Sequence, residues 1–368
     1  MSALAHAIAP ATVLRGDGAW QQALVPIAGL VQRPLLLGRS AATQALRQRL
    51  QADLEAAGLQ PWPAELAHDC CDEDLEPLAQ QAVAAGVDGV MAAGGGKVLD
   101  AGKLLADRLG LPCITVPTSA ATCAGWTALA NVYSPEGAFR YDVALAGCPE
   151  LLVFDHALVA AAPARTLASG IADAVAKWYE ASVSSGSSSD GLIQQAVQMA
   201  RVLRDQLLLD GQAAMTQPGS EAWVRVAEAC GLTAGVIGGV GGARCRTVAA
   251  HAVHNGLTQL QACHRQLHGE KVGFGILVQL RLEEVLGGSQ LAAQARRQLV
   301  PFFAALNLPL TLADLGLADA SLSELQLACD FACRPGSDLH HLPFAVSPAD
   351  LLAALVSTTA GIGAEQPA

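Results

Sequence analysis

The sequence predicts an α/β domain followed by an all-α domain, with the boundary near residue 160. Short apolar runs alternate with amphipathic stretches between about residues 35 and 118, and this order is typical of a parallel sheet with helices on both faces. After residue 155 the apolar residues recur at helical spacing, with little sign of strands. A chain of 368 residues is long enough for two domains, which we place at residues 1–160 and 161–368.

The elements of the first domain follow from local composition. PLLLG at 34–38 predicts a strand, and residues 40–58 predict an amphipathic helix that ends on a glycine. The elements expected next are a helix at about 75–85, a strand at 87–96 that runs into glycines, a helix at about 98–108 and a strand at 112–118. Residues 129–146 contain the turn SPEG and predict a β-hairpin at the edge of the sheet.

The second domain is expected to begin with a helix at Pro163, because the fixed φ of proline suits the first helical turn. The low-complexity stretch SSGSSSD at 184–190 predicts a surface loop between two helices.

The composition excludes several classes of protein. A net charge of −11 argues against a surface that binds nucleic acid or an anionic membrane. The most apolar run, residues 229–243, is too short and too rich in glycine to span a membrane, and the N-terminus lacks the pattern of a signal peptide. The ten cysteines lack zinc-ribbon spacing, so most are expected to be buried thiols. We therefore expect a cytoplasmic protein with a small-molecule ligand.

Two segments could line a nucleotide. AAGGGKVLDAGK at 92–103 puts three glycines between a strand and a helix, where backbone N–H groups can approach a pyrophosphate. It matches neither GxGxxG nor the Walker A pattern, since Val98 follows Lys97, so a turn without a ligand stays open. VPTSAATCAGWTALANVY at 116–133 supplies small hydroxyl side chains after a strand, and the alternative is an ordinary polar loop.

Four of the nine histidines lie within 18 residues. His251 and His254 share a helical face, and His268 follows beside a glycine. Such a cluster suits a divalent metal, although two nearby histidines are often ordinary surface residues. Asp173 and Lys177 are four residues apart on a helical face flanked by Ala, Ile and Val. They could form a simple ion pair, or Asp173 could complete the histidine site.

Five segments, taken in order, resemble the iron-containing, or group III, alcohol dehydrogenase superfamily, and its glycerol dehydrogenase branch in particular. They are GGGKVLDAGK (94–103), VPTSAAT (116–122), APARTLASGIADAVAKWYEA (162–181), AAHAVHNGLT (249–258) and HGEKVGFG (268–275). The resemblance covers nearly the whole chain. It implies the dehydroquinate synthase-like fold, in which a Rossmann-like dinucleotide-binding domain and a helical metal-binding domain enclose an active site in the cleft between them.

The same resemblance implies an NAD- or NADP-linked oxidoreductase with one divalent metal, usually Zn²⁺ in this branch, with Fe²⁺ as the alternative. The metal would be held by Asp173, His251 and His268, and His254 would lie near the nicotinamide and the substrate without being a ligand. The residues implied around the cofactor are Gly95, Gly96, Lys97 and Asp100 at the pyrophosphate and ribose, and Thr118, Ala121, Thr122, Thr127, Leu129 and Tyr133 beside the adenosine and nicotinamide. Relatives form symmetric homo-oligomers, so we expect a homo-oligomer here.

Two departures from the glycerol dehydrogenase pattern favour a carboxylated substrate. Cys123 stands where that branch typically has an Asp that contacts the polyol, and a thiol cannot replace the hydrogen bonds of a carboxylate. Lys177 stands where typical glycerol dehydrogenases have a small neutral residue, and its ammonium would attract an anion. The strings ATCAGW and AKWYEA also resemble the hydroxycarboxylate dehydrogenase sub-branch, which reduces 2-oxo acids.

We therefore predict a dehydrogenase for a 2-hydroxy acid and its 2-oxo acid, with His254, Lys177 and Cys123 at the reacting centre. The alternatives are a glycerol dehydrogenase that makes dihydroxyacetone, a dehydroquinate synthase-like lyase and, more remotely, a ligand-binding protein without activity.

A third departure concerns the cofactor. NAD-preferring relatives supply an Asp for the adenosine ribose at the first strand–helix turn, and that position is Gly38 here, followed by Arg39. Without an acid to repel it, and with Arg nearby, a 2′-phosphate can be accommodated. We therefore predict that NADPH is used at least as well as NADH.

Lysine is rare in this chain, since only four of the 22 basic side chains are Lys. All four, Lys97, Lys103, Lys177 and Lys271, fall in the segments assigned to chemistry. A compact ammonium fits a tight pocket where a planar guanidinium does not, although four residues can also be placed so by chance.

Overall fold

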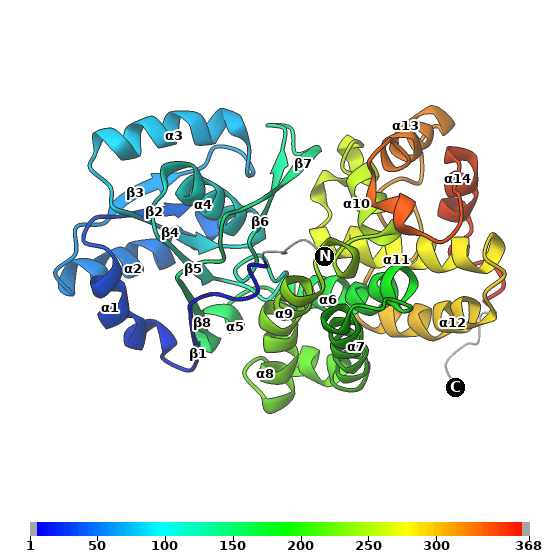
Figure 1. The fold of residues 1–368 in the computed structure, drawn as a ribbon, viewed down its shortest axis with the longest axis horizontal. Helices are drawn as coiled ribbons and strands as arrows, with labels where there is room; N and C mark the ends of the chain where they lie inside the picture. Colours follow the sequence, from blue (N-terminus) through cyan, green and yellow to red (C-terminus); the bar gives the residue numbers. More distant parts are fainter. Residues whose placement is uncertain (1–5, 363–368) are drawn as a thin grey trace.

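The first half of the chain folds around a six-stranded parallel sheet. The computed structural model describes residues 6–362, and Figure 1 shows the sheet on one side and the helical half on the other. The strands, in spatial order, are β1 (Thr12–Gly16), β8 (Leu151–Asp155), β5 (Cys113–Pro117), β4 (Gly89–Gly94), β2 (Pro34–Gly38) and β3 (Trp62–Glu65).

Helices cover both faces of this sheet, as the sequence predicts. Alternate residues of each central strand point to opposite faces, so Leu36 and Met91 pack on one side while Leu35 and Val90 pack on the other. The first face is covered by α1 (Ala19–Leu30) and α2 (Gln44–Ala56), and the second by α3 (Asp72–Ala84) and α4 (Gly96–Leu109).

The sequence missed both edge strands and α1. The edge strands β1 and β3 are four or five residues long and half-exposed, so they lack the continuous apolar run that identifies the central strands. Helix α1 contains Pro26, which weakens a helical pattern. The strand expected at 87–96 ends at Gly94, because Gly95 is already the N-cap of α4.

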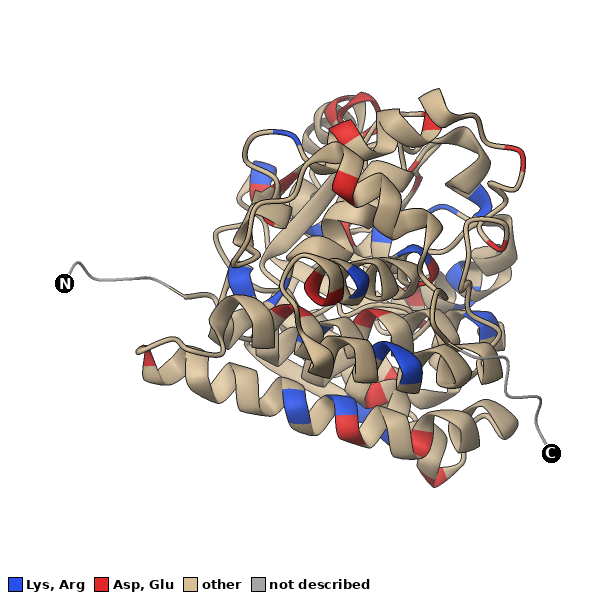
Figure 2. Cartoon of the chain, turned by 90° about the vertical axis from the view of Figure 1, so that its right-hand side faces the viewer, with Lys and Arg blue, Asp and Glu red and all other residues tan. Residues whose placement is uncertain are grey.

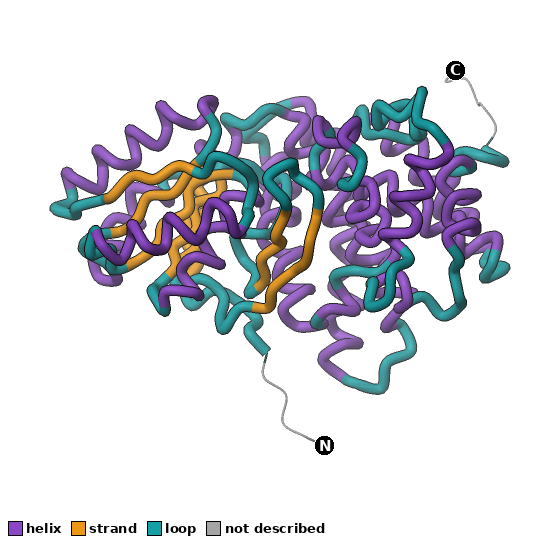
Figure 3. The backbone as a smooth tube through the Cα atoms, turned by 90° about the horizontal axis from the view of Figure 1, so that it is seen from above, coloured by secondary structure: helices purple, strands orange, loops and turns teal. Residues whose placement is uncertain are grey.

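The expected hairpin forms, but its expected position at the edge of the sheet is wrong. Strands β6 (Leu129–Tyr133) and β7 (Phe139–Ala144) make a separate two-stranded antiparallel sheet. Figure 3 shows this hairpin between the parallel sheet and the helical half. One strand is anchored on α4, whose Asp100 accepts the N–H of Asn131, and the other contacts the helical half, where Thr258 Oγ1 accepts the N–H of Phe139. The hairpin therefore joins the two halves.

The described chain is helical after β8. Following α5 (His156–Ala160), its longer helices are α6 (Ala164–Ser185), α7 (Gly191–Thr216), α8 (Glu221–Glu228), α9 (Ala234–Gly241), α10 (Ala249–Leu257), α11 (His268–Val285), α12 (Gln290–Ala305), α13 (Leu322–Ala332) and α14 (Pro348–Val356). The predicted loop between α6 and α7 forms, but it is shorter than expected, because α6 continues to Ser185 and only residues 186–190 separate the two helices. Acidic and basic residues are interspersed along the helices on the side that Figure 2 shows.

Helix α11 lies at the centre of the helical half. Its residues belong to two apolar cores, one shared with α6, α7 and α12 and the other with α10, α13 and α14. The continuous helical stretch 221–241 has the length and apolar composition of a membrane span, yet 61% of its most apolar window is buried inside the protein. Its composition is therefore accounted for by packing within the core.

Candidate active site and metal centre

A cleft of about 680 Å³ lies between the two halves of the chain. Its walls come from the turn before α4, the segment after β5, the hairpin and helices α6, α10 and α11. The residues predicted at the site that line it are Arg39, Gly95, Gly96, Lys97, Asp100, Ala121, Thr122, Cys123, Thr127, Leu129, Tyr133, Asp173, Lys177, His251, His254 and His268. Gly38 and Thr118 are not part of this lining.

Asp173, His251 and His268 bring one ligand atom each to a common point. Asp173 Oδ1 lies 3.3 Å from His251 Nε2 and 3.4 Å from His268 Nε2. Ligands about 2.0–2.1 Å from a tetrahedral Zn²⁺ are about 3.3–3.4 Å apart, so the spacing fits a metal ion. Asp173 Oδ1 is also buried without any hydrogen-bond donor. A buried carboxylate oxygen with no donor and two imidazole nitrogens is a donor set that Zn²⁺ or Fe²⁺ accepts.

A second carboxylate fixes the orientation of His251. Glu180 is fully buried, lies 2.7 Å from His251 Nδ1 and accepts the backbone N–H groups of Val248 and His251. Burial lowers the pKa of His251, but the carboxylates of Glu180 and Asp173 together raise it more, to about 9. The bond to Nδ1 turns Nε2 toward Asp173, as metal-binding histidines require. Sequence reasoning missed Glu180, although it lies seven residues, or two helical turns, after Asp173 on the same face.

Two glycines of α11 allow the ligand-bearing helices to approach closely. A Cβ on Gly269 would lie 1.8 Å from the Ser169 carbonyl oxygen in α6, and one on Gly275 would lie 2.3 Å from the Ala250 carbonyl oxygen in α10. The N–H of Gly269 donates to Ser169 Oγ at 3.0 Å. These contacts place His268, at the first turn of α11, against the middle of α6, where Asp173 lies.

His254 lies beside the metal triad without joining it. Its ring is 4.2 Å from that of His268 between centroids, and its Nδ1 contacts Asn255 Oδ1 at 2.9 Å. Burial, together with the neighbouring His268, holds the pKa of His254 well below its usual value, so its imidazole is neutral. His254 is thus outside the group of metal ligands, and its place near the nicotinamide and the substrate stays a prediction.

Lys177 adds a buried positive charge next to the triad. Its Nζ lies 3.8 Å from Asp173 Oδ1 and 3.4 Å from the carbonyl oxygen of Arg246. Burial lowers the pKa of Lys177, but the neighbouring acidic groups, Asp173 first among them, together raise it above its usual value, so the side chain is an ammonium. Burial raises the pKa of Cys123. Its side chain is therefore a neutral thiol in the cleft wall.

The turn into α4 has the close packing expected of a nucleotide site. A Cβ on Gly96 would come within 2.8 Å of Thr122 Oγ1, so a larger residue would close the approach to the helix N-terminus. Lys97 forms an ion pair with Asp69 and lies 4.9 Å over the Tyr133 ring. Asp100 lines the cleft, but its carboxylate is bound to Lys103 at 3.0 Å and to the hairpin. Asp100 therefore holds the hairpin, and its predicted contact with the cofactor stays a prediction.

The region next to Gly38 holds more charge than the sequence suggested. The Arg47 side chain fills the space beside Gly38, where a Cβ would lie 2.0 Å from its Cδ. Arg47 donates to Ser40 O and Thr43 Oγ1 and forms an ion pair with Glu65. Arg39 forms an ion pair with Asp69, the same carboxylate that holds Lys97. Neither Arg47 nor Asp69 was identified from the sequence, because the ion pairs of Arg47 with Glu65 and of Asp69 with Arg39 and Lys97 join residues distant in the chain.

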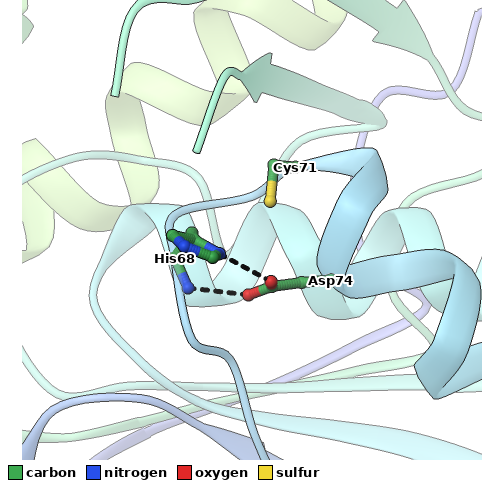
Figure 4. A group of neighbouring side chains, drawn as sticks. All are labelled: His68, Cys71 and Asp74. Carbon is green, nitrogen blue, oxygen red and sulfur yellow. Dashed lines mark hydrogen bonds and ion pairs between the residues drawn. The ribbon is translucent and has the colours of Figure 1, made fainter. Parts of the chain in front are cut away.

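A second group of possible metal ligands, His68, Cys71 and Asp74, lies at the start of α3 (Figure 4). Both oxygens of Asp74 are already engaged, one by the N–H of His68 at 2.7 Å and the other by its Nδ1 at 2.8 Å. Burial raises the pKa of Cys71, which favours the thiol. We interpret this group as the cap of α3, whose N-cap is Cys71.

The comparisons with known proteins place these features in context. The model of a family described as iron-containing alcohol dehydrogenase matches residues 10–156. The chain is 54% identical to an uncharacterized oxidoreductase of Synechocystis, over 96% of this chain and 91% of that one. It is 36% identical to hydroxycarboxylate dehydrogenase A of Escherichia coli, over 77% of this chain and 78% of that one. The crystal structure of a probable glycerol dehydrogenase from Sinorhizobium meliloti superposes with a TM-score of 0.85 at 30% identity, over 97% of this chain and 98% of that one.

The metal content of variants tests the triad directly. Asp173→Asn removes the only charged ligand, so we expect purified protein to lose its bound divalent metal, as measured by elemental analysis. His68→Ala is the matched control, because it disrupts the group at α3 and should retain the metal. Metal that stays after Asp173→Asn and leaves after His68→Ala would assign the metal to α3.

Glu180→Gln tests the orientation of His251. Without the carboxylate, His251 Nδ1–H loses its charged acceptor, and we expect metal affinity to fall about 10- to 100-fold in competition with a chelator. Glu283, a half-buried acid farther along α11, provides the control variant Glu283→Gln, which should bind metal as the parent does. Equal affinities for all three proteins would show that Glu180 plays no part.

Proposed function

The chain belongs to the iron-containing alcohol dehydrogenase family, in its glycerol dehydrogenase branch, and we propose that it interconverts a small 2-hydroxy acid and the corresponding 2-oxo acid with NAD or NADP. In the direction of reduction, a hydride passes from nicotinamide C4 to C2 of the oxo acid and a proton completes the hydroxyl group. A divalent metal bound by Asp173, His251 and His268 would supply Lewis-acid polarisation of the reacting oxygen.

The buried ammonium of Lys177 carries the proposal. It lies 3.8 Å from Asp173 Oδ1, so a substrate that reaches the triad also meets this cation. Glycerol has no charge with which to compensate a desolvated ammonium, whereas a carboxylate next to the reacting carbon does. Cys123 offers no carboxylate to a polyol and no negative charge to repel an acid. The residues of the cleft would thus orient the substrate and exclude water from the reacting atoms.

Glycerol oxidation is the second candidate. It is favoured by the glycerol dehydrogenases among the relatives, including one from Pseudomonas putida. Relatives that match most of the chain are named oxidoreductases, dehydrogenases or reductases, which favours either dehydrogenase over a lyase.

For the cofactor, we propose that NADPH is used at least as well as NADH. Gly38 leaves the end of β2 without an acidic side chain, and Arg39, Ser40 and Thr43 line the adjoining cleft. The guanidinium of Arg47 lies in the space that an acid at position 38 would enter. A 2′-phosphate would meet positive charge and hydroxyl groups there.

The substrate prediction is tested with Lys177→Met, which keeps the length of the side chain and removes its charge. We expect kcat/KM for 2-oxobutanoate to fall about 10- to 100-fold, the value of a charge-assisted hydrogen bond, while turnover of dihydroxyacetone changes little. Metal content and Tm serve as controls for folding. A parent enzyme with equal or higher kcat/KM for glycerol than for 2-oxo acids would refute the proposed function.

The cofactor prediction is tested with Gly38→Asp. The new carboxylate would repel a 2′-phosphate and attract a ribose, so we expect the ratio of kcat/KM for NADPH to that for NADH to fall at least about tenfold. Gly38→Ala is the matched control, because its Cβ crowds Arg47 equally without adding charge. An unchanged ratio in the Asp variant would count against NADPH.

A further inference from the structure

Arg246 is a second cation of the cleft that the sequence did not reveal. It follows the short 3₁₀ turn Ala243–Cys245 and precedes α10, and its side chain forms part of the cleft lining. The stem of Arg246 packs on Gly238 of α9, where a Cβ would lie only 2.7 Å from Cδ and 2.8 Å from Cγ. The absence of a side chain at position 238 thus makes room for Arg246 to reach the cleft.

The guanidinium of Arg246 has no partner among the residues that the structure describes. Its Nε is buried without a hydrogen bond, and within residues 6–362 its side chain forms neither a hydrogen bond nor an ion pair. The other arginines of the lining differ: Arg39 is paired with Asp69, and Arg265, which forms no ion pair among the described residues, has no buried nitrogen left without a hydrogen bond. Burial of a polar group without a partner is costly, so the unused Nε–H indicates a ligand that accepts from it.

The charges around Arg246 specify the kind of ligand. Lys177 Nζ lies 3.4 Å from the backbone carbonyl oxygen of Arg246, and both residues line the cleft, so two cationic side chains come from neighbouring parts of its wall. Asp338 also lines the cleft, and its carboxylate lies 3.6 Å from His341 Nδ1 and within 4.0 Å of no arginine among the described residues. The ion-pair partner of Lys177 is Asp173, which is itself one of the three residues of the metal triad. An anion is therefore needed to balance Arg246.

We propose that Arg246 determines specificity by binding a second carboxylate, so that the preferred substrate is a dicarboxylic 2-oxo or 2-hydroxy acid. This inference rests on the proposed function. Lys177, beside the triad, would bind the carboxylate next to the reacting carbon. Arg246 would present Nε–H and one Nη–H side by side to the distal carboxylate, a geometry that guanidinium forms and ammonium cannot.

Two substrates isolate this contact. 2-Oxoglutarate and 2-oxopentanoate share five carbons and the reacting end, and they differ only in a distal carboxylate against a methyl group. We expect the parent enzyme to prefer 2-oxoglutarate. Arg246→Gln should lower kcat/KM for 2-oxoglutarate about 10- to 100-fold, chiefly through KM, and leave that for 2-oxopentanoate nearly unchanged.

Two further variants complete the test. Arg246→Lys keeps the charge and loses the paired donors, so it should recover part of the preference for 2-oxoglutarate; it also serves if the Gln variant does not fold. Arg244→Gln, on an exposed neighbour in the same turn, should behave as the parent enzyme. If the Arg246 variants lower kcat/KM for both oxo acids equally, or for neither, Arg246 does not bind the distal carboxylate. The proposed function then still stands. If the parent enzyme prefers glycerol to both, the proposed function itself fails.

Discussion

The Asp173 carboxylate lies in the middle of α6 with an exposed fraction of 3%, and one of its oxygens accepts no hydrogen bond. A buried charge without compensation would cost several kcal/mol, so the packing around it is organised to supply cations and ligands. Lys177 approaches from the next turn of the same helix, His251 from α10 and His268 from α11. Gly269 and Gly275 of α11 allow this arrangement, because a Cβ at either position would collide with the backbone of α6 or α10 and keep the ligands apart.

The sequence predicted the parts of this arrangement that depend on local spacing or on motif. The predicted elements that formed are the central strands β2, β4 and β5, the helices α2, α3 and α4 and the start of α6, and the sequence also singled out the three residues that the structure groups together, Asp173, His251 and His268. Glu180, Arg47, Asp69 and Arg246 were not singled out, since each acts on a group brought near only by folding. The hairpin illustrates the same limit. Its turn is local and was recognised, but its attachment to α4 and α10 depends on Asp100 and Thr258, which are distant in sequence.

The scarcity of lysine acquires a more specific meaning in the structure. Lys97, Lys177 and Lys271 line the cleft, while Lys103 is buried behind it and donates to carbonyl oxygens of Thr127 and Leu129. Burial lowers the pKa of both Lys97 and Lys271 to about 8. Three of the four lysines therefore face the space between the two halves, and the fourth supports the hairpin that joins them. Most of the lysines thus line the cleft, whereas of the arginines only Arg39, Arg246 and Arg265 do.

Charge balance in the cleft is the physical argument for the carboxylated substrate that we propose over a polyol. A divalent metal would use the negative charge of Asp173, because a carboxylate that binds a metal no longer neutralises its neighbour fully. Lys177 would then be under-compensated, and Arg246 already lacks a partner. A neutral polyol would leave both cations desolvated, and water in an enclosed cleft compensates them only in part. A carboxylated substrate brings the missing charge with it, so binding and desolvation favour the same ligand.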